Sequence, residues 1–241
     1  MPKSAYHVAV DAIQATIRPW LQEQGFRVRG RAFNRVTDDG LTQVISIQMG
    51  PFEPPGTVEI PGLRENLHGL FTVNLGVYVP EIALHHWGGG AKAWVHESDC
   101  AIRARLGRVC TEARDLWWQA VAIPEVVEAI RERLSVYGLP WLQRFATREL
   151  VLRELHGLDR SHWVAAPRIA MAIIRWARGE AAEAHALLAD QAAEAATSHR
   201  GHAEYVRELA LRLGLGILDG KHAPVADGAG VPHSMNISRR V

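Results

Sequence analysis

The chain has 241 residues, of which 48% are hydrophobic and 22% are charged, a composition typical of a globular protein with a sizeable core. Its 27 Lys and Arg residues nearly balance its 26 Asp and Glu residues, so no global field attracts nucleic acid or an anionic membrane. Two cysteines are too few for a disulfide framework, and we find neither a signal-peptide pattern nor an apolar run of about 20 residues. We therefore expect a cytoplasmic protein with reduced thiols and no membrane segment.

The first expected element is a helix. Ser4 is a suitable N-cap, and Pro19 is expected to kink or end the helix before Gly25 closes the segment. Apolar residues follow Ser4 at the three- and four-residue spacings of one helix face: Val10, Ile13, Ile17 and Leu21.

Four segments then alternate apolar and polar residues, which indicates half-buried antiparallel strands: residues 26–36, 43–49, 71–78 and 100–107. In the third segment the core side is Phe71, Val73, Leu75 and Val77, and in the fourth it is Cys100, Ile102, Ala104 and Leu106. The pattern predicts a four-stranded antiparallel sheet with one apolar and one polar face.

The first of these segments is less regular than the others. Phe26 and Phe33 fall on opposite faces unless a bulge near Gly30 shifts the phase. The turn at residues 38–40, Asp-Asp-Gly, predicts a hairpin with the second strand. Residues 50–62 contain four prolines and are expected to form a long irregular loop, which in compact domains tends to be functional or mobile.

From residue 123 onward the apolar period is that of helices. Five helices are expected, at residues 124–137, 140–152, 167–178, 180–196 and 202–213. The third and fourth are joined by Gly179 and resemble one tetratricopeptide unit, but a solenoid needs at least three, which favours a plain antiparallel helical subdomain. The tail at residues 217–241 is poor in apolar residues and is expected to be disordered.

These elements predict an α+β protein with an N-terminal helix, a four-stranded antiparallel sheet and a C-terminal helical region. The expected division is an α+β sheet domain at residues 1–122, a helical subdomain at 123–216 and the tail at 217–241.

Several short motifs recur together in the first part of the chain: Gly25-Phe26, Phe33, Arg35, Ile47-Gln48, residues 71–77 (Phe-Thr-Val-Asn-Leu-Gly-Val), residues 100–107, Trp117-Trp118 and residues 138–142. As a spaced set they resemble a widespread bacterial family that is known only as a domain of unknown function. The resemblance covers about residues 20–145. It implies no reaction, cofactor or substrate.

The polar face of the expected sheet is the candidate ligand-binding surface. Arg103 and Arg105 share one face of the fourth strand, and Gln48 and Asn74 lie on the polar phase of theirs. Guanidinium groups with amides nearby suit a carboxylate or phosphate, because guanidinium donates two parallel hydrogen bonds. A polar face that is solvated, or covered by the C-terminal helices through ion pairs, would give the same pattern.

Arg27, Arg29 and Arg31 recur at period two and could extend this surface into a stripe that follows phosphates. An arginine-rich edge strand that resists aggregation has the same sequence. The near-zero net charge argues against nucleic acid as the partner.

Residues 96–100 (His-Glu-Ser-Asp-Cys) contain the residue types of a nucleophilic triad. In a strand, however, His96 and Cys100 would lie about 13 Å apart, beyond hydrogen-bond reach. Cys100 also falls on the apolar phase, where a thiol is usually a small core residue.

His85 and His86 precede three glycines without zinc-ligand spacing, and we interpret them as exposed imidazoles beside a glycine hinge. No metal site and no cofactor are predicted. On a helix Trp117 and Trp118 could not both face one core, so one of them is expected at an interface or a ligand pocket.

The sequence favours a non-catalytic binding or interaction module that presents the polar sheet face to a protein partner or a small anionic ligand. The alternative is an enzyme that acts on a small anionic substrate between sheet and helices, with Arg105 orienting the substrate and a histidine as acid or base. The sequence indicates neither the oligomeric state nor whether a reaction is catalysed.

Overall fold

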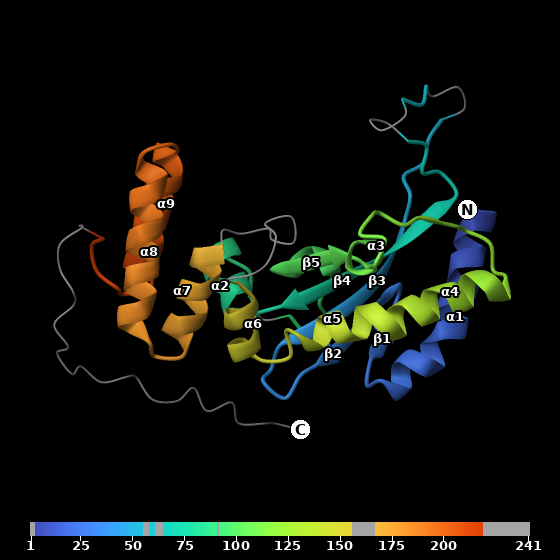
Figure 1. Ribbon diagram of the computed structural model, residues 1–241, viewed down its shortest axis with the longest axis horizontal. Helices are drawn as coiled ribbons and strands as arrows, with labels where there is room; N and C mark the ends of the chain where they lie inside the picture. The colour runs from blue at the N-terminus through green and yellow to red at the C-terminus, as the bar shows by residue number, and fades with distance from the viewer. Residues whose placement is uncertain (1–2, 55–57, 61–64, 91, 156–166, 219–241) are drawn as a thin grey trace.

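The computed structural model describes residues 3–54, 58–60, 65–90, 92–155 and 167–218 (Figure 1). It has the predicted α+β class, with an N-terminal helix, an antiparallel sheet and a C-terminal helical region. The strands are β1 Arg27–Arg29, β2 Ala32–Val36, β3 Thr42–Met49, β4 Leu70–Tyr78, β5 Ile102–Arg105 and β6 Trp118–Gln119. The helices are α1 Ala5–Glu23, α2 Pro80–Trp87, α3 Leu106–Val109, α4 Pro124–Arg133, α5 Leu139–Gln143, α6 Arg148–Leu155, α7 Pro167–Ala177, α8 Ala181–Ala196 and α9 Arg200–Arg212. A 3-10 turn, η1, spans Glu97–Asp99, and a π turn, η2, spans Leu134–Gly138.

The sheet has six strands rather than the predicted four, in the order β1-β2-β3-β4-β5 with β6 also paired to β4. Part of the difference is that residues 26–36 form a hairpin and not one bulged strand. Arg29 pairs with Ala32 across a tight turn in which Gly30 has φ +56°, a conformation that glycine adopts at little cost. The hairpin places Phe26 and Phe33 in the same core, which removes the phase conflict seen in the sequence.

The fourth predicted strand is also shorter than expected. Only residues 102–105 pair with β4, between η1 on one side and α3 on the other. Cys100 therefore does not continue the apolar phase of Ile102. It is buried on the opposite side of the sheet beside Val44 and Tyr78, whereas Ala101 and Ile102 both enter the main core.

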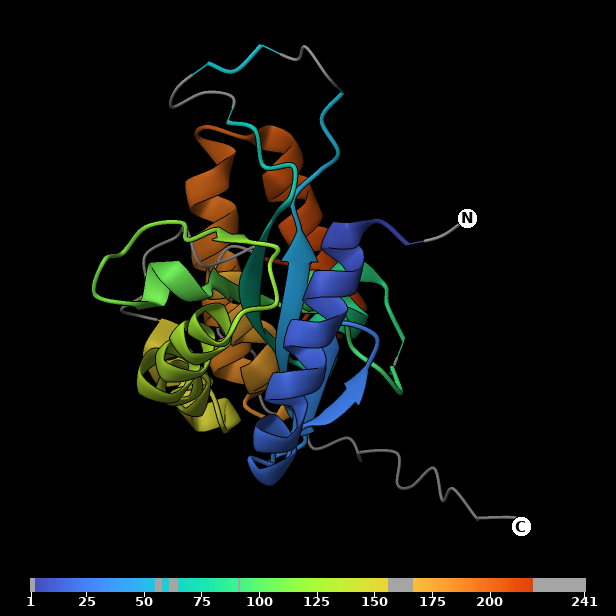
Figure 2. The same cartoon turned by 90° about the vertical axis from the view of Figure 1, so that its right-hand side faces the viewer.

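One face of the sheet carries the main core. The predicted core side of β4 is fully buried, as are the predicted apolar residues of α1, namely Val10, Ile13, Ile17 and Leu21. Helix α1 continues past Pro19 to Glu23, so this proline does not end it. Helices α4 and α5 lie on one side of the strands and the segment after α2 on the other (Figure 2). The same core continues into the C-terminal helices through residues such as Ile173 and Leu188.

The C-terminal helices follow the predicted apolar periods, with one break. The expected helix at 140–152 is two helices, because Thr147 caps α6 by accepting a hydrogen bond from the Leu150 N–H at 3.2 Å. Gly179 joins α7 to α8 with φ +83°, and α8 also packs against α9. The predicted disordered tail lies outside the described residues from residue 219 onward.

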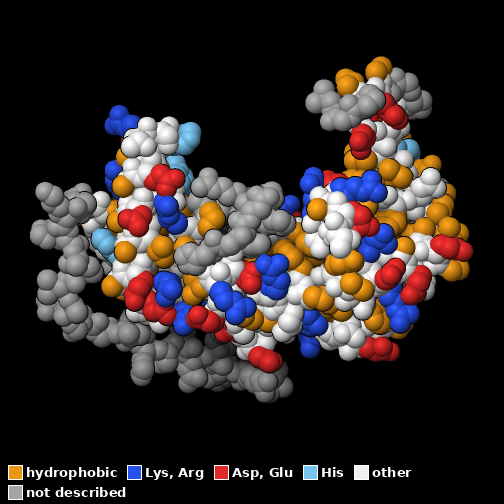
Figure 3. All heavy atoms as spheres, viewed as in Figure 1, with side chains coloured by type: hydrophobic (Ala, Val, Ile, Leu, Met, Phe, Trp, Pro, Cys, Tyr) orange, Lys and Arg blue, Asp and Glu red, His pale blue; other side chains and the backbone are white. Residues whose placement is uncertain are grey.

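In the part of the chain that the structure describes, no helix is both long enough and apolar enough to cross a bilayer. On the face seen in Figure 3, acidic and basic side chains are interspersed, in line with the net charge of +1. Any charged binding surface must therefore be local.

Candidate functional site

The strand register defines the polar face of the sheet. Directly opposed residues share a face, so Arg27, Asn34, Val44 and Gly76 line up across β1 to β4, and Asn74 stands opposite Arg105. Continuing the alternation gives the whole polar face: Arg27, Arg29, Ala32, Asn34, Val36, Thr42, Val44, Ser46, Gln48, Thr72, Asn74, Gly76, Tyr78, Arg103 and Arg105. The four predicted ligand-binding residues therefore lie on one face, as the alternation required.

The polar face is partly covered by one segment, residues 92–100, which we call the cover segment. Asn34 holds it through two hydrogen bonds to Val95, from Nδ2 to the carbonyl oxygen at 3.0 Å and from the Val95 N–H to Oδ1 at 2.9 Å. Beneath it lies a second, small core made of Val44, Tyr78, Ala83, Val95 and Cys100. The face is thus not uniformly open to solvent. The sequence had left open whether it is solvated or covered by the C-terminal helices.

Gly76 explains how the cover segment comes so close to β4. A Cβ atom at this position would lie 2.6 Å from Cys100 Sγ and 3.0 Å from Cys100 Cβ, closer than real Cβ contacts. The glycine of the Asn74-Leu75-Gly76 run therefore makes room for a side chain from the cover segment.

The structure brings two of the predicted residues into contact. Asn74 Nδ2 donates a hydrogen bond to Gln48 Oε1 at 2.7 Å, which fixes both amides at the same end of the polar face. Asn74 is buried and Gln48 is exposed.

The two predicted arginines already have carboxylate partners. Arg103 pairs with Glu97 of η1, and Arg105 pairs with Asp115. The Arg105 guanidinium also lies over the Trp117 ring, 5.1 Å from its centroid. Both arginine side chains are only about a third exposed, at 38% and 34%, so their charges are largely compensated where they stand.

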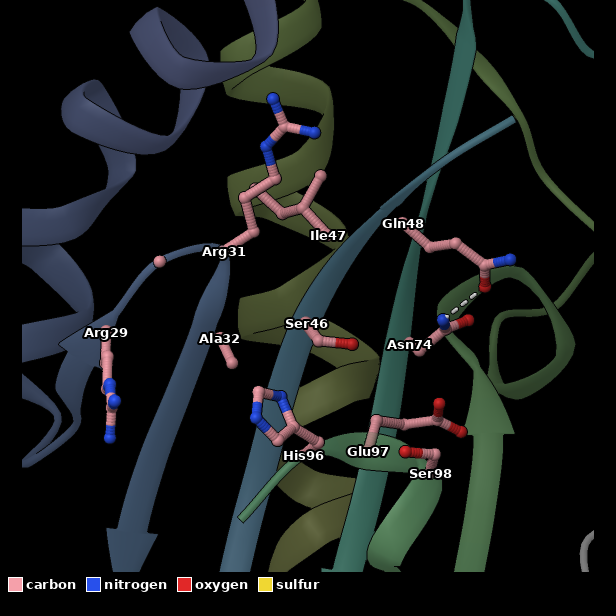
Figure 4. A pocket seen from close by; sticks show the side chains of 11 residues that line it. Arg29, Arg31, Ala32, Ser46, Ile47, Gln48, Asn74, His96, Glu97 and Ser98 are labelled. Atoms are coloured by element: carbon pink, nitrogen blue, oxygen red, sulfur yellow. Dashed lines mark hydrogen bonds between the residues drawn. The ribbon is translucent and has the colours of Figure 1, made fainter. Parts of the chain in front are cut away.

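Between the cover segment and the two amides is a shallow hollow of about 410 Å³, which we call the polar-face hollow (Figure 4). Its lining is Arg29, Gly30, Arg31, Ala32, Ser46, Ile47, Gln48, Asn74, His96, Glu97 and Ser98. In Figure 4 Ser46 lies at the centre, with His96 and Glu97 below it and the Gln48–Asn74 pair to one side. Four strands, the turn between β1 and β2, and the cover segment therefore contribute to a single concave surface.

The charges around this hollow differ in whether they are compensated. Arg31 turns toward α1 and pairs with Asp11 at 2.9 Å, and Lys3 also binds Asp11 at 2.7 Å. Hydrogen bonds from Lys3 and then from Arg31 lower the pKa of the Asp11 carboxyl. Arg29 is exposed and has no ion-pair partner among the described residues. One uncompensated positive charge therefore borders the hollow.

The triad-like run at residues 96–100 does not form an extended strand, the case for which the spacing was considered. The η1 turn folds it back, so that Cys100 Sγ lies 3.6 Å from the His96 carbonyl oxygen. Burial of Cys100 raises the pKa of its thiol well above the ordinary value, and Glu97 and Asp99 act in the same direction. Burial and the neighbouring carboxylates therefore disfavour a nucleophilic thiolate. The sequence had argued against one from the distance between His96 and Cys100.

The prediction that His85 and His86 are exposed imidazoles beside a hinge was wrong. Both belong to α2, which Gly88 ends with φ +67°. The His85 ring packs 4.7 Å from Trp176 of α7, and His86 Nδ1 hydrogen-bonds the Tyr205 hydroxyl of α9. Burial lowers the pKa of both imidazoles. They join the sheet to the C-terminal helices and lie apart from the polar-face hollow.

Trp117 and Trp118 lie at a strand and not on a helix. Trp118 of β6 packs against Phe71 on the core side, with ring centroids 5.9 Å apart, and Trp117 lies under Arg105. The two rings therefore face opposite sides of the sheet. The reason is the alternation of side chains along an extended segment, and not their spacing on a helix. Among the described residues no three His, Cys, Asp or Glu side chains lie close enough to hold a metal ion.

Three residues that line the hollow were not predicted as site residues from the sequence, namely Ser46, Arg29 and His96. Ser46 could have been found, because it shares the alternation phase of Gln48. Arg29 was recognised only as part of a stripe, since the hairpin that places it in one cross-strand row with Ala32 and Ser46 was not predicted. His96 reaches the hollow through an irregular segment, which no periodicity reveals.

One family model matches the chain. Residues 64–144, about a third of its length, match DUF4304, a domain of unknown function. This confirms the predicted resemblance to an uncharacterised domain family, over a shorter range than expected. No curated protein and no solved structure matches the chain. The matched range supplies Asn74, His96, Arg103 and Arg105, and the preceding part of the chain supplies Arg29, Ser46 and Gln48.

Proposed function

We propose that the protein is a non-catalytic binding module whose polar-face hollow takes a small anion or the acidic group of a protein partner. The observation that carries the proposal is Arg29. It borders the hollow without an ion-pair partner among the described residues, whereas Arg103 and Arg105 are compensated by carboxylates.

The chemistry of the lining supports a carboxylate with further polar groups. Arg29 can donate two parallel hydrogen bonds to a carboxylate. Ser46 supplies a hydroxyl, and Gln48 keeps its Nε2 donors because only its Oε1 is used by Asn74. Glu97 at the lower edge disfavours a ligand with several negative charges. A single carboxylate therefore suits the hollow better than a polyanion.

The four residues predicted from the sequence take two roles in this proposal. Gln48 and Asn74 contact the ligand. Arg103 and Arg105 frame the site, because Arg103 holds η1 through Glu97 and Arg105 lies against Trp117. A ligand that bound these arginines directly would have to displace Glu97 or Asp115.

The test is a titration of the ¹⁵N-labelled protein with acetate, succinate and a capped glutamate peptide, followed by NMR. We expect shifts at Ser46, Gln48 and His96, and a loss of affinity of about tenfold or more in Arg29→Ala, because a hydrogen bond to a charged group is removed. Arg18→Ala is the matched control, since Arg18 is an exposed arginine of α1 that does not line the hollow. Unchanged affinity in a folded Arg29→Ala protein would refute the proposal.

An enzyme is the second candidate, and the position of His96 favours it. His96 lines the same hollow as Asn74, which stands opposite Arg105 in the register. In this case His96 would act as acid or base on a small anionic substrate. Incubation with each binding carboxylate followed by mass spectrometry separates the two functions. Recovery of unchanged compound supports the binding module, and conversion that His96→Gln abolishes supports the enzyme.

A further inference from the structure

A second hollow, of about 540 Å³, lies on the polar face beside the first, and we call it the basic hollow. It is lined by Gly25, Arg27, Val28, Arg29, Asn34, Val36, Thr42, Lys92, Ala93, Trp94 and Val95. The Asn34–Val95 hydrogen bonds form one wall, and the edge strand β1 forms another. The basic hollow thus lies between β1, at the edge of the sheet, and the first residues of the cover segment.

The lining of the basic hollow contains three cationic residues and no Asp or Glu. Arg27 and Arg29 stand two residues apart on one face of β1, which places their Cα atoms about 7 Å apart. Both are exposed and without an ion-pair partner among the described residues. Lys92 is bound to Asp99 at 2.6 Å, so it adds less charge than the two arginines. In a chain of net charge +1, this is a local concentration of positive charge.

Trp94 adds an independent observation. Its indole Nε1 is buried and has no hydrogen-bond acceptor among the described residues. A buried donor that is left unpaired costs about 1–3 kcal/mol, and a bound water or ligand oxygen is the usual explanation. Val28, Val36 and Ala93 give the same hollow an apolar side.

We infer that the basic hollow binds the phosphate monoester of a small organic molecule. A phosphate monoester carries a charge of about −1.5 to −2 at neutral pH, which matches the two unpaired guanidinium groups. Arg27 and Arg29 hold the phosphate oxygens as bidentate donors. The organic part lies against the Trp94 ring and Val36.

This site is separate from the polar-face hollow of the proposed function. Among the residues that the structure describes, that hollow contains Glu97 and one cation without a carboxylate partner, whereas no carboxylate lines the basic hollow. Arg29 borders both, so Arg27 is the residue that reports on the basic hollow alone, and Gln48 reports on the polar-face hollow alone.

The experiment follows the indole N–H signal of Trp94 by NMR, assigned by its loss in Trp94→Phe. The probes are AMP, glucose 6-phosphate and inorganic phosphate. We expect the two monoesters to shift this signal and to bind more tightly than inorganic phosphate. Arg27→Ala should weaken AMP or glucose 6-phosphate binding by about tenfold or more, and Arg18→Ala and Gln48→Ala should leave it unchanged.

Three results would overturn the inference. The first is no shift of the Trp94 indole signal with either monoester at millimolar concentration and low salt. The second is inorganic phosphate binding as tightly as the monoesters, since the organic part would then not be recognised. The third is a single-stranded oligonucleotide that binds far more tightly than AMP with a steep salt dependence, which would assign the arginines to a nucleic-acid backbone. The two proposals share Arg29, and their failures are distinguished by Arg27→Ala and Gln48→Ala, because Arg27 lines the basic hollow alone and Gln48 the polar-face hollow alone.

Discussion

The two faces of the sheet are covered in very different ways. On the apolar face, α1, α4 and α5 lie over the strands, and Phe33, Ile45 and Leu75 belong to a continuous core. On the polar face, the 92–100 segment covers the strands over a core of only five residues, and Asn34 ties it down. The helix-covered face carries a continuous core, whereas the crossing segment leaves a hollow on each side.

The two faces therefore contribute differently: the helix-covered face mainly to folding stability, and the polar face mainly to binding. Burial of apolar area on the helix-covered face supplies the main driving force for folding. The other face has a much smaller apolar core, which is typical of regions that open locally at low cost. Both hollows border the thinly covered face, so variants there should change binding more than folding.

The two faces should differ most in how much free energy of unfolding is lost when one side chain is truncated to alanine. Leu75→Ala removes a fully buried side chain from the main core and should lower the free energy of unfolding by about 2–5 kcal/mol. Arg29→Ala, at an exposed position of the polar face with no ion-pair partner among the described residues, should change it by about 0.5 kcal/mol or less. Urea denaturation measures both. Comparable losses in the two variants would show that the faces contribute equally to stability.

Gly76 offers a sharper comparison, because it lies on β4 where the 92–100 segment comes closest. Gly76→Ala places a Cβ atom against Cys100 and should cost about 1–3 kcal/mol of stability. The matched control is Gly201→Ala, because nothing lies within 4 Å of a Cβ atom there and the residue is in α9, where alanine is favoured over glycine. A Gly76→Ala protein as stable as this control would show that Cys100 of the 92–100 segment is not in close contact with β4 at this position.

Asn34 tests how firmly the 92–100 segment is held. Asn34→Ala removes two hydrogen bonds and leaves the buried Val95 backbone groups without partners, at a cost of about 1–2 kcal/mol. The loss should appear locally, as faster labelling of Cys100 by a thiol reagent, because Cys100 is buried under this segment. Labelling of Cys110, which belongs to the main core, should change little.

Gln22→Ala is the control for this experiment, since Gln22 is an exposed amide of α1. Equal acceleration of both thiols in Asn34→Ala would mean that the whole protein opens and that the 92–100 segment is not a separate unit.

The central strands could be predicted because their alternation is regular and long. Phe71 to Val77 and Ile45 to Met49 have the predicted apolar side, and Gln48 and Asn74 meet on the other. The β1–β2 hairpin was missed because two residues at Gly30 reverse the chain. A two-residue turn inside a polar, arginine-rich stretch resembles a bulge when only the alternation is read.

The sequence could not predict whether the arginines have carboxylate partners. Glu97 and Asp115, which compensate Arg103 and Arg105, lie in irregular segments whose path is set by tertiary packing. Asn34 and Val95 are 61 residues apart, so their contact leaves no local signal in the sequence. Periodicity identifies the face of a strand, but it does not show what crosses that face.

The smallest expected effect is a pH dependence of the 92–100 segment through Asp99. Burial alone would raise the pKa of this carboxyl, but hydrogen bonds from Lys92 and from the His96 backbone N–H outweigh burial and hold the pKa below its ordinary value of 3.8. The folded state therefore favours the ionised form. Its stabilising contribution is complete above the ordinary pKa and is lost as the pH falls through the lower pKa of the folded state.

Hydrogen exchange of the Cys100 amide, which donates to the Glu97 carbonyl at 3.0 Å, reports on this turn. After correction for the intrinsic rate, its protection should stay constant from neutral pH down to the ordinary pKa of Asp99 and fall only as the pH is lowered below that value, while the Leu75 amide in β4 keeps its protection. Asp99→Asn should remove the pH dependence, and Asp190→Asn, an exposed aspartate of α8, should retain it. Parallel loss at Cys100 and Leu75 would instead mean that acid weakens both faces together, because a locally held segment must open before the core does.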